Sequence, residues 1–508
     1  MTRQLAVLIV AGVIVALPFV VRDAPSNGAW REGDPVLTII SPHNEAIRYE
    51  FGRAFSEWHR QRFGKPVKVE WITVGGTTEI SRYLVSEYVA AFRAWWTAQG
   101  NAWPAGAADE LVAREPKRFP EMHRRFREVD DPRQFTSKLD LFFGGGEFDH
   151  TRAHQQGLTV APWRPGEEPV ELLAQIPAEV SGEVWRTPYM IGTCLSTFGI
   201  CYNVDRLRAL GVAEPPTRWE DLTDPVYFGQ LGVADPTKSG SIAKAFEMII
   251  QQQMREAADP ASGWERGIRL IQLIGANARY FTDSASKVPI DVAAGDAAAG
   301  LAIDFYARFQ AEVSGKGRMG YVTPRGGSSV SADPISLLRG APNREVAVRF
   351  IEFVLSREGQ RLWMAEPGTP RGPQKYRLCR TPIRLDLHAE LPPMLEQPME
   401  LARTFTYRRE WTSGHFNLQR DLVRAMCLDS GEELRRAWRE IIRRGGPQAQ
   451  PQAMACLQQL PVTWTTAREV VKQKNRLTYL REWTEFFRAN YRQAERLARD
   501  AREVARAW

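Results

Sequence analysis

Short apolar runs alternate with stretches of helical hydrophobic spacing from about residue 35 to residue 355, and this alternation constrains the fold most. Residues 36–40 predict a buried strand, 46–63 carry apolar side chains at helical spacing, and 66–74 return to a strand pattern. Further strands are expected at 138–143, 229–234, 300–303 and 334–338, and further helices at 241–254 and 343–355. Strands that alternate with helices predict a parallel α/β sheet with helices on its faces.

Two parts of the chain depart from this alternation. Residues from about 88 to 136 are rich in Trp and charge and predict a helical insertion. After about Leu385 strand signals nearly vanish, which predicts a helical tail with a basic end. Trp483, Phe486, Phe487 and Tyr491 lie at helical spacing in that tail. We favour packing of this face on the rest of the fold, and a surface for a partner or for anionic lipid headgroups is the alternative.

The composition is that of a folded protein of several domains. The 508 residues are 44% hydrophobic and 25% charged, with 67 Lys and Arg against 60 Asp and Glu, a net charge of +7. These values exclude a disordered chain, a collagen-like fibre and a multi-span membrane protein. Much of the basic excess lies in residues 465–508, so no general nucleic-acid-binding surface is implied.

The N-terminal sequence has the pattern of an export signal. Arg3 precedes an apolar run from Leu5 to Val21, which Pro18 interrupts. This pattern predicts that residues 1–28 are a signal peptide or an N-terminal membrane anchor, with the rest of the chain outside the cytoplasm. Because no Cys lies near the segment, attachment of a lipid to an N-terminal Cys is excluded.

Five cysteines are few for an exported chain of this length. We interpret Cys194 and Cys201, in an apolar stretch, as buried thiols. Cys379, Cys427 and Cys456 leave room for one disulfide bond. No CxxC motif is present, so a zinc ribbon or a thioredoxin-like motif is excluded.

Six segments in a fixed order carry a family resemblance. They are residues 37–46, 140–146, 199–205, 233–241, 295–303 and 349–360. With them, the chain from about 34 to 384 resembles the extracytoplasmic solute-binding proteins of bacterial ABC importers, in particular the branch of ferric-iron binders. That branch has relatives for thiamine and for phosphorylated or phosphonate compounds. The insertion and the tail fall outside the resemblance.

The resemblance implies an α/β, two-lobed type II periplasmic-binding-protein fold with hinge strands, plus a C-terminal helical extension. Lobe one would comprise residues 34–195 and 328–385, with the insertion at about 88–136. Lobe two would comprise 198–325, and the extension 386–508. The implied partners are an ABC permease and its ATPase, and the implied location is the periplasm, free or anchored in the inner membrane. No cofactor is implied, although ferric iron would be a transported ligand.

The resemblance also points to metal ligands. His43 matches the position of an iron-ligating His, and Asp304 and Tyr306 stand where ferric binders carry adjacent tyrosines. Phe305 replaces the second tyrosine, and a phenyl ring cannot ligate a metal. Glu147 lies near the ligating carboxylate of the family, with a solvated Glu at a helix start as the alternative. These four residues, His43, Glu147, Asp304 and Tyr306, form the candidate set for ferric iron.

An organic anion would use other atoms. Three polar, Gly-rich loops precede predicted helices, where bare amides and helix N-termini favour negative charge. Hydroxyl groups in these loops are suited to phosphate, phosphonate or carboxylate oxygens, and helix capping is the alternative role. With the loop around His43, the candidate ligand-binding residues are Ser41, His43, Asn44, Gly75, Gly76, Thr77, Gly145, Gly146, Ser239, Gly240, Ser241, Asp304 and Tyr306.

No other motif predicts catalysis. His150 and His154 have the i, i+4 spacing of a metal pair, but we favour a solvated helix face. GxSxG, P-loop and GxGxxG motifs are absent, so we expect no enzyme activity and assign ATP hydrolysis to a partner. A membrane-anchored sensor or scaffold with the same two-lobed fold, and no transported ligand, is the alternative function.

Overall fold

The first of the two large sheets joins strands from both ends of the α/β region; a third, two-stranded sheet pairs β5 Glu179–Val180 with β6 Glu183–Val184. The computed structural model describes residues 30–128, 131–315, 317–412 and 414–505. The strand order is β15-β8-β14-β3-β1-β2, with β4 beside β14 and β7 beside β8. The pairs β1–β2 and β1–β3 are parallel, and β14 is antiparallel to β3 and β8. The bounds are β1 Val36–Ile40, β2 Lys68–Ile72, β3 Leu141–Phe143, β4 Thr159–Val160, β7 Arg186–Thr187, β8 Met190–Ser196, β14 Ser331–Leu338 and β15 Thr381–Pro382.

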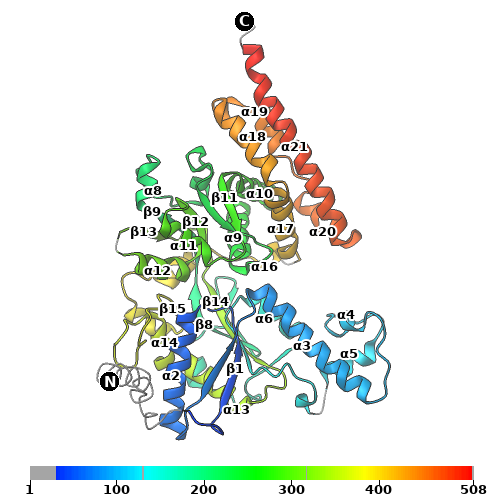
Figure 1. The fold of residues 1–508 in the computed structure, drawn as a ribbon, viewed down its shortest axis with the longest axis vertical. Helices are drawn as coiled ribbons and strands as arrows, with labels where there is room; N and C mark the ends of the chain where they lie inside the picture. The colour runs from blue at the N-terminus through cyan, green and yellow to red at the C-terminus, as the bar shows by residue number, and fades with distance from the viewer. Residues whose placement is uncertain (1–29, 129–130, 316, 413, 506–508) are drawn as a thin grey trace, which may run out of the picture.

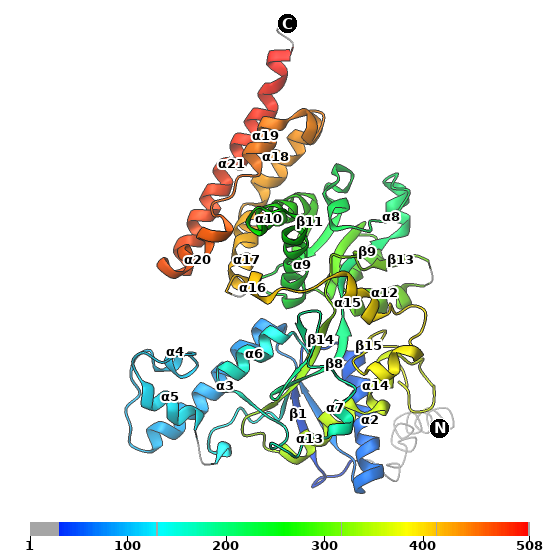
Figure 2. The same ribbon diagram turned by 180° about the vertical axis from the view of Figure 1, so that it is seen from behind.

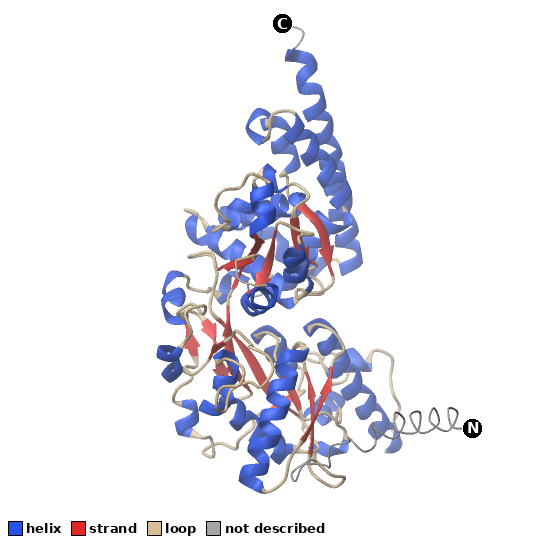
Figure 3. Ribbon diagram, turned by 60° about the vertical axis from the view of Figure 1, so that its left-hand side comes forward, coloured by secondary structure: helices blue, strands red, loops and turns tan. Residues whose placement is uncertain are grey.

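The strands of the second sheet lie in the sequence between β8 and β14 of the first sheet. Its order is β11-β10-β12-β9-β13. The pairs β10–β11 and β10–β12 are parallel, whereas β9 is antiparallel to β12 and β13. Its strands are β9 Phe198–Asn203, β10 Leu231–Ala234, β11 Ala278–Thr282, β12 Ala299–Ile303 and β13 Met319–Val322. Each sheet with its helices forms a lobe, and we call them lobe one and lobe two (Figure 3).

The chain crosses between the lobes on extended strands. Only Thr197 separates β8 in lobe one from β9 in lobe two, and residues 323–330 return the chain from β13 to β14. The predicted parallel pairing is confirmed within each lobe, but the crossing strands pair antiparallel. The predicted two-lobed α/β fold with a helical C-terminal part is confirmed (Figure 1).

Helices cover the faces of both sheets. Helices α3 to α5 fill the segment predicted as a helical insertion and project to one side of lobe one (Figure 1). The helices of lobe one are α2 Glu45–Phe63, α3 Thr77–Ala98, α4 Ala107–Leu111, α5 Pro120–Arg127, α6 Glu147–Gln155, α7 Val170–Leu173, α13 Arg344–Leu355 and α14 Arg357–Met364. Those of lobe two are α8 Val204–Ala209, α9 Gly240–Glu256, α10 Pro260–Asn277, α11 Lys287–Ala294 and α12 Asp304–Ser314.

The C-terminal extension packs on lobe two, as the sequence predicted (Figure 2). Trp483, Phe487 and Tyr491 are buried in the same apolar core as the lobe helices. The indole N–H of Trp438 donates to Asn277 Oδ1 at 2.8 Å. The helices of the extension are α15 Pro398–Thr404, α16 Arg409–Thr412, α17 Phe416–Val423, α18 Gly431–Arg443, α19 Pro451–Leu457, α20 Trp464–Gln473 and α21 Arg476–Ala505, with a π-helical turn at Arg424–Asp429.

All five cysteines are buried free thiols. The interpretation of Cys194 and Cys201 is therefore confirmed, and a disulfide bond among the other three is wrong because none of them is paired. The predicted signal or anchor at residues 1–28 lies outside the described residues. Within the described part of the chain, no helix is both long enough and apolar enough to cross a membrane.

Candidate functional site

The N-termini of α3 and α9 meet between the lobes. A Cβ placed on Gly76, which caps α3, would lie 3.0 Å from the carbonyl oxygen of Lys238 in lobe two. A Cβ on Gly240, at the start of α9, would lie 2.9 Å from Thr77 Oγ1 in lobe one. A Cβ on Gly145 would lie 2.8 Å from Thr77 Cγ2. Glycine at these positions lets the loops of Gly145 and Gly240 approach Thr77, and lets the loop of Gly76 approach Lys238 in the other lobe.

Several of the predicted polar residues form local turns and caps. Ser41 Oγ accepts the backbone N–H of His43 at 3.1 Å. Asn44 Oδ1 caps α2 and Ser239 Oγ caps α9. Ser241 is partly exposed in the first turn of α9, and Gly75 precedes the cap of α3 with a φ of 122°. Capping leaves the remaining lone pairs of these oxygens free, so it does not exclude contact with a ligand.

Asp149, in the first turn of α6, places a carboxylate at this meeting point. One of its oxygens, Oδ2, lies 3.7 Å from the Cβ position of Gly240 and 3.9 Å from that of Gly146. Burial raises the pKa of Asp149, whereas a hydrogen bond from Thr77 and the charge of Arg420 oppose the rise. A side chain of the protein therefore supplies negative charge where the helix N-termini favour it.

A fully buried arginine lies beside the crossing strands. Arg380 Nη2 donates to Ser196 Oγ at 2.7 Å and contacts Asp333 Oδ2 at 2.5 Å. Its Cζ lies 3.8 Å from the ring centroid of Phe305, a residue of lobe two. Although burial disfavours the charged form, the Asp333 carboxylate raises the pKa of Arg380 above its usual value. Arg380 therefore places a permanent positive charge where the lobes meet.

His43 completes this arginine cluster. Its Nε2 lies 3.4 Å from Arg380 Nη1, and its ring packs edge-on against Phe143 at 4.6 Å between centroids. Burial, and then the charge of Arg380, lower the pKa of His43 well below its ordinary value, so the ring is neutral. Among the described residues, neither His43 Nδ1 nor Arg380 Nε has a hydrogen-bond partner. Two buried polar atoms thus lack partners at the contact between the lobes.

The loop at 144–146 joins the arginine cluster to the helix ends. Gly144 packs on His43, since a Cβ there would lie 2.5 Å from Nε2, and the next residue contacts Thr77. The two groups of atoms are therefore neighbouring parts of one interlobe site.

The other candidate metal ligands have partners of their own. Asp304 Oδ2 pairs with Arg308 at 3.1 Å, and burial raises the pKa of Asp304 to about 6. Burial raises the pKa of Tyr306 to about 12. Glu147 Oε1 pairs with Arg409 of the extension at 2.8 Å. Within the described residues, no group of three or more His, Cys, Asp and Glu side chains is placed to hold a metal ion.

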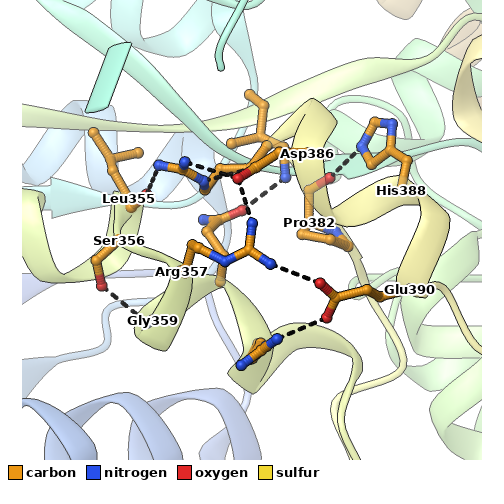
Figure 4. Close-up of polar contacts among 12 residues, drawn as sticks. Leu355, Ser356, Arg357, Gly359, Pro382, Asp386, His388 and Glu390 are labelled. Atoms are coloured by element: carbon orange, nitrogen blue, oxygen red, sulfur yellow. Dashed lines mark hydrogen bonds and ion pairs between the residues drawn. The ribbon is translucent and has the colours of Figure 1, made fainter. Parts of the chain in front are cut away.

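A salt-bridge network holds the segment that carries Arg380 (Figure 4). Arg357 of α14 pairs with Asp386 at 2.5 Å and with Glu390 at 2.6 Å. Arg384 pairs with the other oxygen of Asp386 at 2.9 Å. Burial alone would raise the pKa of Asp386, but the two guanidinium groups lower it. The network fixes β15 and residues 383–390 against α14, and so fixes the backbone next to Arg380.

The prediction of a solvated helix face is wrong for His150. His150 is fully buried, with Nδ1 2.8 Å from Ser336 Oγ and its ring stacked on Phe142 at 3.9 Å. His154 stacks on Tyr189 at 3.6 Å between centroids. Helix α6 lies against the first sheet, so His150 fills a packed layer instead of facing water, whereas His154 stays partly exposed.

Sequence reasoning missed the charged residues of the site. Asp149 is visible next to His150, but nothing in the sequence marks it as a cleft residue. Arg380 and Arg420 lie in segments without a motif, and Asp333 precedes the proline of a predicted strand. The only signal for Asp333 is its place at a strand boundary between the lobes.

The middle part of the chain matches a known protein family. Residues 153–376 match the family described as bacterial extracellular solute-binding protein. Over these residues the chain is similar to that family. Its members are substrate-binding proteins, and the match covers the crossing strands, lobe two and β14.

Individual relatives match the chain in part. An uncharacterized protein of Haemophilus influenzae is 28% identical over 227 residues, which are 44% of this chain and 60% of that protein. The phosphoglycerate transport regulatory protein PgtC of Salmonella typhimurium is 26% identical over 204 residues, 38% of this chain and 48% of PgtC. The chain thus spans about half to three fifths of the length of these relatives.

A solved structure is also similar. It is the periplasmic binding protein AfuA of Actinobacillus pleuropneumoniae with bound fructose-6-phosphate, at 19% identity and a TM-score of 0.48. The similarity covers 75% of this chain and 98% of AfuA.

Proposed function

We propose that the chain is the extracytoplasmic substrate-binding component of an ABC importer and captures a small anionic solute between its lobes. The permease and its ATPase would receive the loaded protein, and no covalent chemistry is required of this chain. Closure around a solute needs contacts from both lobes, because only a difference in affinity between the open and closed states shifts their populations.

The observation that carries the proposal is the buried arginine cluster. Arg380 and His43 contribute two polar atoms without partners, and Phe305 of lobe two stacks on the same guanidinium. A guanidinium fork suits a carboxylate, phosphate or phosphonate group. The loops of α3 and α9 add backbone amides from both lobes. A solute at this place would therefore contact both lobes.

The electrostatics favour an anion over ferric iron. A metal at His43 would bind next to the charged Arg380, and two of the four candidate ligands are already paired with arginines. Cationic neighbours disfavour a metal ion at the same place. Ferric iron nevertheless belongs in the experiment, because His43 and Tyr306 are the side chains that it would use.

The test is the melting temperature of the full chain with ferric citrate and with a panel of phosphorylated, phosphonate and carboxylate compounds. A solute at about 100 times its dissociation constant stabilises the folded protein by about 2.7 kcal/mol, which is a readable shift. We expect a shift with one class of anion and none with iron. A shift with iron alone would overturn the anionic assignment.

Single substitutions distinguish binding of an organic anion from binding of ferric iron. Arg380→Lys keeps the charge but loses the planar fork, so we expect it to abolish most of the anion-induced shift. Arg384→Lys is the matched control, because Arg384 pairs with Asp386 in the network behind the site. If ferric citrate does give a shift, Tyr306→Phe should reduce that shift far more than it reduces the shift with an organic anion, since the substitution removes only a phenolic oxygen. Equal, small effects on both ligands would contradict a ligand role for Tyr306.

A membrane-anchored sensor or scaffold is the second candidate. The extension favours it, because Arg409 of the extension pairs with Glu147 of lobe one. The name of the Salmonella relative also describes a regulatory protein. The sensor would give no melting shift with any transported compound.

A further inference from the structure

The C-terminal extension contacts both lobes beside the interlobe site. Helices α16 and α17 lie next to α9 of lobe two and face α6 of lobe one (Figures 1 and 2). The contacts come from residues 405–412 and 414–421, which lie outside the part of the chain that matches the family. This segment is long enough to reach from one lobe to the other, so it is placed to control their separation.

Arg420 of α17 binds the two lobes with one guanidinium group. Its Nε donates to the carbonyl oxygen of Pro236 at 2.6 Å, and its Nη2 donates to that of Thr237 at 2.9 Å. The same Nη2 donates to Thr78 Oγ1 of lobe one at 3.0 Å. The planar, rigid fork of arginine makes such a bridge geometrically defined.

Two further contacts hold the start of α6 in lobe one. Arg409 pairs with Glu147 at 2.8 Å, and the ring of Phe416 lies 4.8 Å from that of Phe148. Both partners in lobe one belong to the first turn of α6. An ion pair and an aromatic contact therefore reinforce the bridge made by Arg420.

The same segment is anchored firmly to lobe two. The side-chain amide of Gln251 in α9 exchanges two hydrogen bonds with the backbone of Arg408, both at 2.9 Å. The hydroxyl of Tyr407 donates to Glu247 of α9 at 2.9 Å, and Lys244 lies 3.6 Å from the centre of its ring. Separation of the lobes would thus break the contacts to lobe one and keep those to lobe two.

Asp149 supplies a negative charge close to the guanidinium group of Arg420. It lies where α3, α6 and α9 begin, and the charge of Arg420 acts on its carboxylate. The protein therefore holds an anion and a cation of its own at the junction that a solute would otherwise bridge.

We propose that residues 405–412 and 414–421 form a latch that holds the two lobes together without solute, and that must release lobe one before the cleft opens. The proposal goes beyond the function above and does not depend on which solute the protein binds. Opening then requires loss of the contacts made by Arg409, Phe416 and Arg420, and of the hydrogen bond that the backbone N–H of Tyr407 donates to the carbonyl oxygen of Ser181 in lobe one at 2.8 Å, in addition to bending of the crossing strands.

The latch can be reached from solution. A cavity of about 1030 Å³ lies between α3 and the extension, and Thr78, Phe148, Thr237 and Arg420 are in its wall. The contacts of the latch are therefore at the edge of an open space, and their release needs no unfolding of the core.

The experiment measures the separation of the lobes in the full chain without added solute. Lys65→Cys in lobe one and Glu214→Cys in lobe two replace exposed residues, and all five native cysteines are buried, so a pair of maleimide dyes labels the introduced thiols. Single-molecule energy transfer is compared for the parent, for Arg420→Ala and for Arg424→Ala. Arg424 is the matched control, because its guanidinium pairs with Asp429 inside the extension.

We expect Arg420→Ala to create a population of low transfer efficiency that the parent and Arg424→Ala lack. Thr78→Val removes only the acceptor in lobe one, so we expect the same population at a smaller fraction. If Arg420→Ala fails to fold, Thr78→Val decides the question, because a methyl group replaces a hydroxyl group there. Unchanged efficiency in the variants that fold, or equal opening in Arg424→Ala, would overturn the latch. Since no solute is present, failure of the transport function would leave this result unaffected.

Discussion

The guanidinium of Arg380 in lobe one stacks on the ring of Phe305 in lobe two, with 3.8 Å between Cζ and the ring centroid. The same guanidinium contacts Ser196, the last residue of β8, and Asp333, in β14. One buried cation therefore links a crossing strand, its neighbour and the second lobe. Because both lobes contact Arg380, the local electrostatics depend on how closely the lobes approach each other.

Replacement of Arg380 alone should lower the free energy of unfolding more than replacement of Arg380 and Asp333 together. Arg380→Met leaves the buried carboxylate of Asp333 without a partner, and we expect a loss of about 3–5 kcal/mol in the free energy of unfolding. Arg380→Met with Asp333→Asn should recover part of that loss, because no unpaired charge remains. Urea unfolding of the two single variants and the double variant measures the coupling. Losses that simply add would contradict the pairing.

A methyl group on Gly240 should separate the lobes. Its Cβ would lie 2.9 Å from Thr77 Oγ1, closer than side chains tolerate, and both atoms belong to well-packed helix starts. We expect Gly240→Ala to increase the radius of gyration in solution scattering and to weaken solute binding. Gly431→Ala is the control, since the nearest atom to its Cβ is 3.5 Å away at the end of the Arg435 side chain. An unchanged radius for Gly240→Ala would show that the lobes do not meet there.

The two-lobed architecture could be predicted from the sequence because the patterns that indicate it lie within short stretches of the chain. Period and spacing predict β1, α2 and α9, and the order of six segments indicates the family resemblance. The charged residues of the site could not be predicted in this way. Arg380 reaches His43 from 337 positions away, and Arg420 reaches Thr78 from 342. Such contacts depend on how lobes and extension pack, and no pattern within a short window records them. The wrong prediction for His150 has the same origin, because helical spacing alone does not tell which face of α6 meets the sheet.

The extension should unfold together with lobe two. Tyr491 donates its buried hydroxyl to the carbonyl oxygen of Met426 at 3.1 Å and lies 2.9 Å from the side-chain amide of Gln272 in α10. Tyr491→Phe removes these bonds, and we expect it to lower the free energy of unfolding by about 1 kcal/mol. Hydrogen exchange of α10 and α21 should accelerate by the same factor. Acceleration in α21 alone would indicate that the extension unfolds independently.

His150 should make the protein less stable in mild acid. Burial lowers the pKa of His150 from 6.5 to about 3, so the folded chain keeps this ring neutral while the unfolded chain takes up a proton below pH 6.5. The free energy of unfolding therefore falls as the pH drops from 6.5 towards 3. Between pH 7 and pH 5 the expected loss is about 2 kcal/mol for this one group.

The variant His150→Gln isolates this effect. Buried carboxyl groups with a raised pKa, such as Asp304, act in the opposite direction, but they are present in both proteins and cancel in the comparison. Urea unfolding at pH 7 and pH 5 should show a loss that is about 2 kcal/mol smaller for His150→Gln than for the parent. The same pH dependence in both proteins would mean that the ring is already accessible to protons in the folded state, and the stacking of His150 on Phe142 would then not describe the protein in solution.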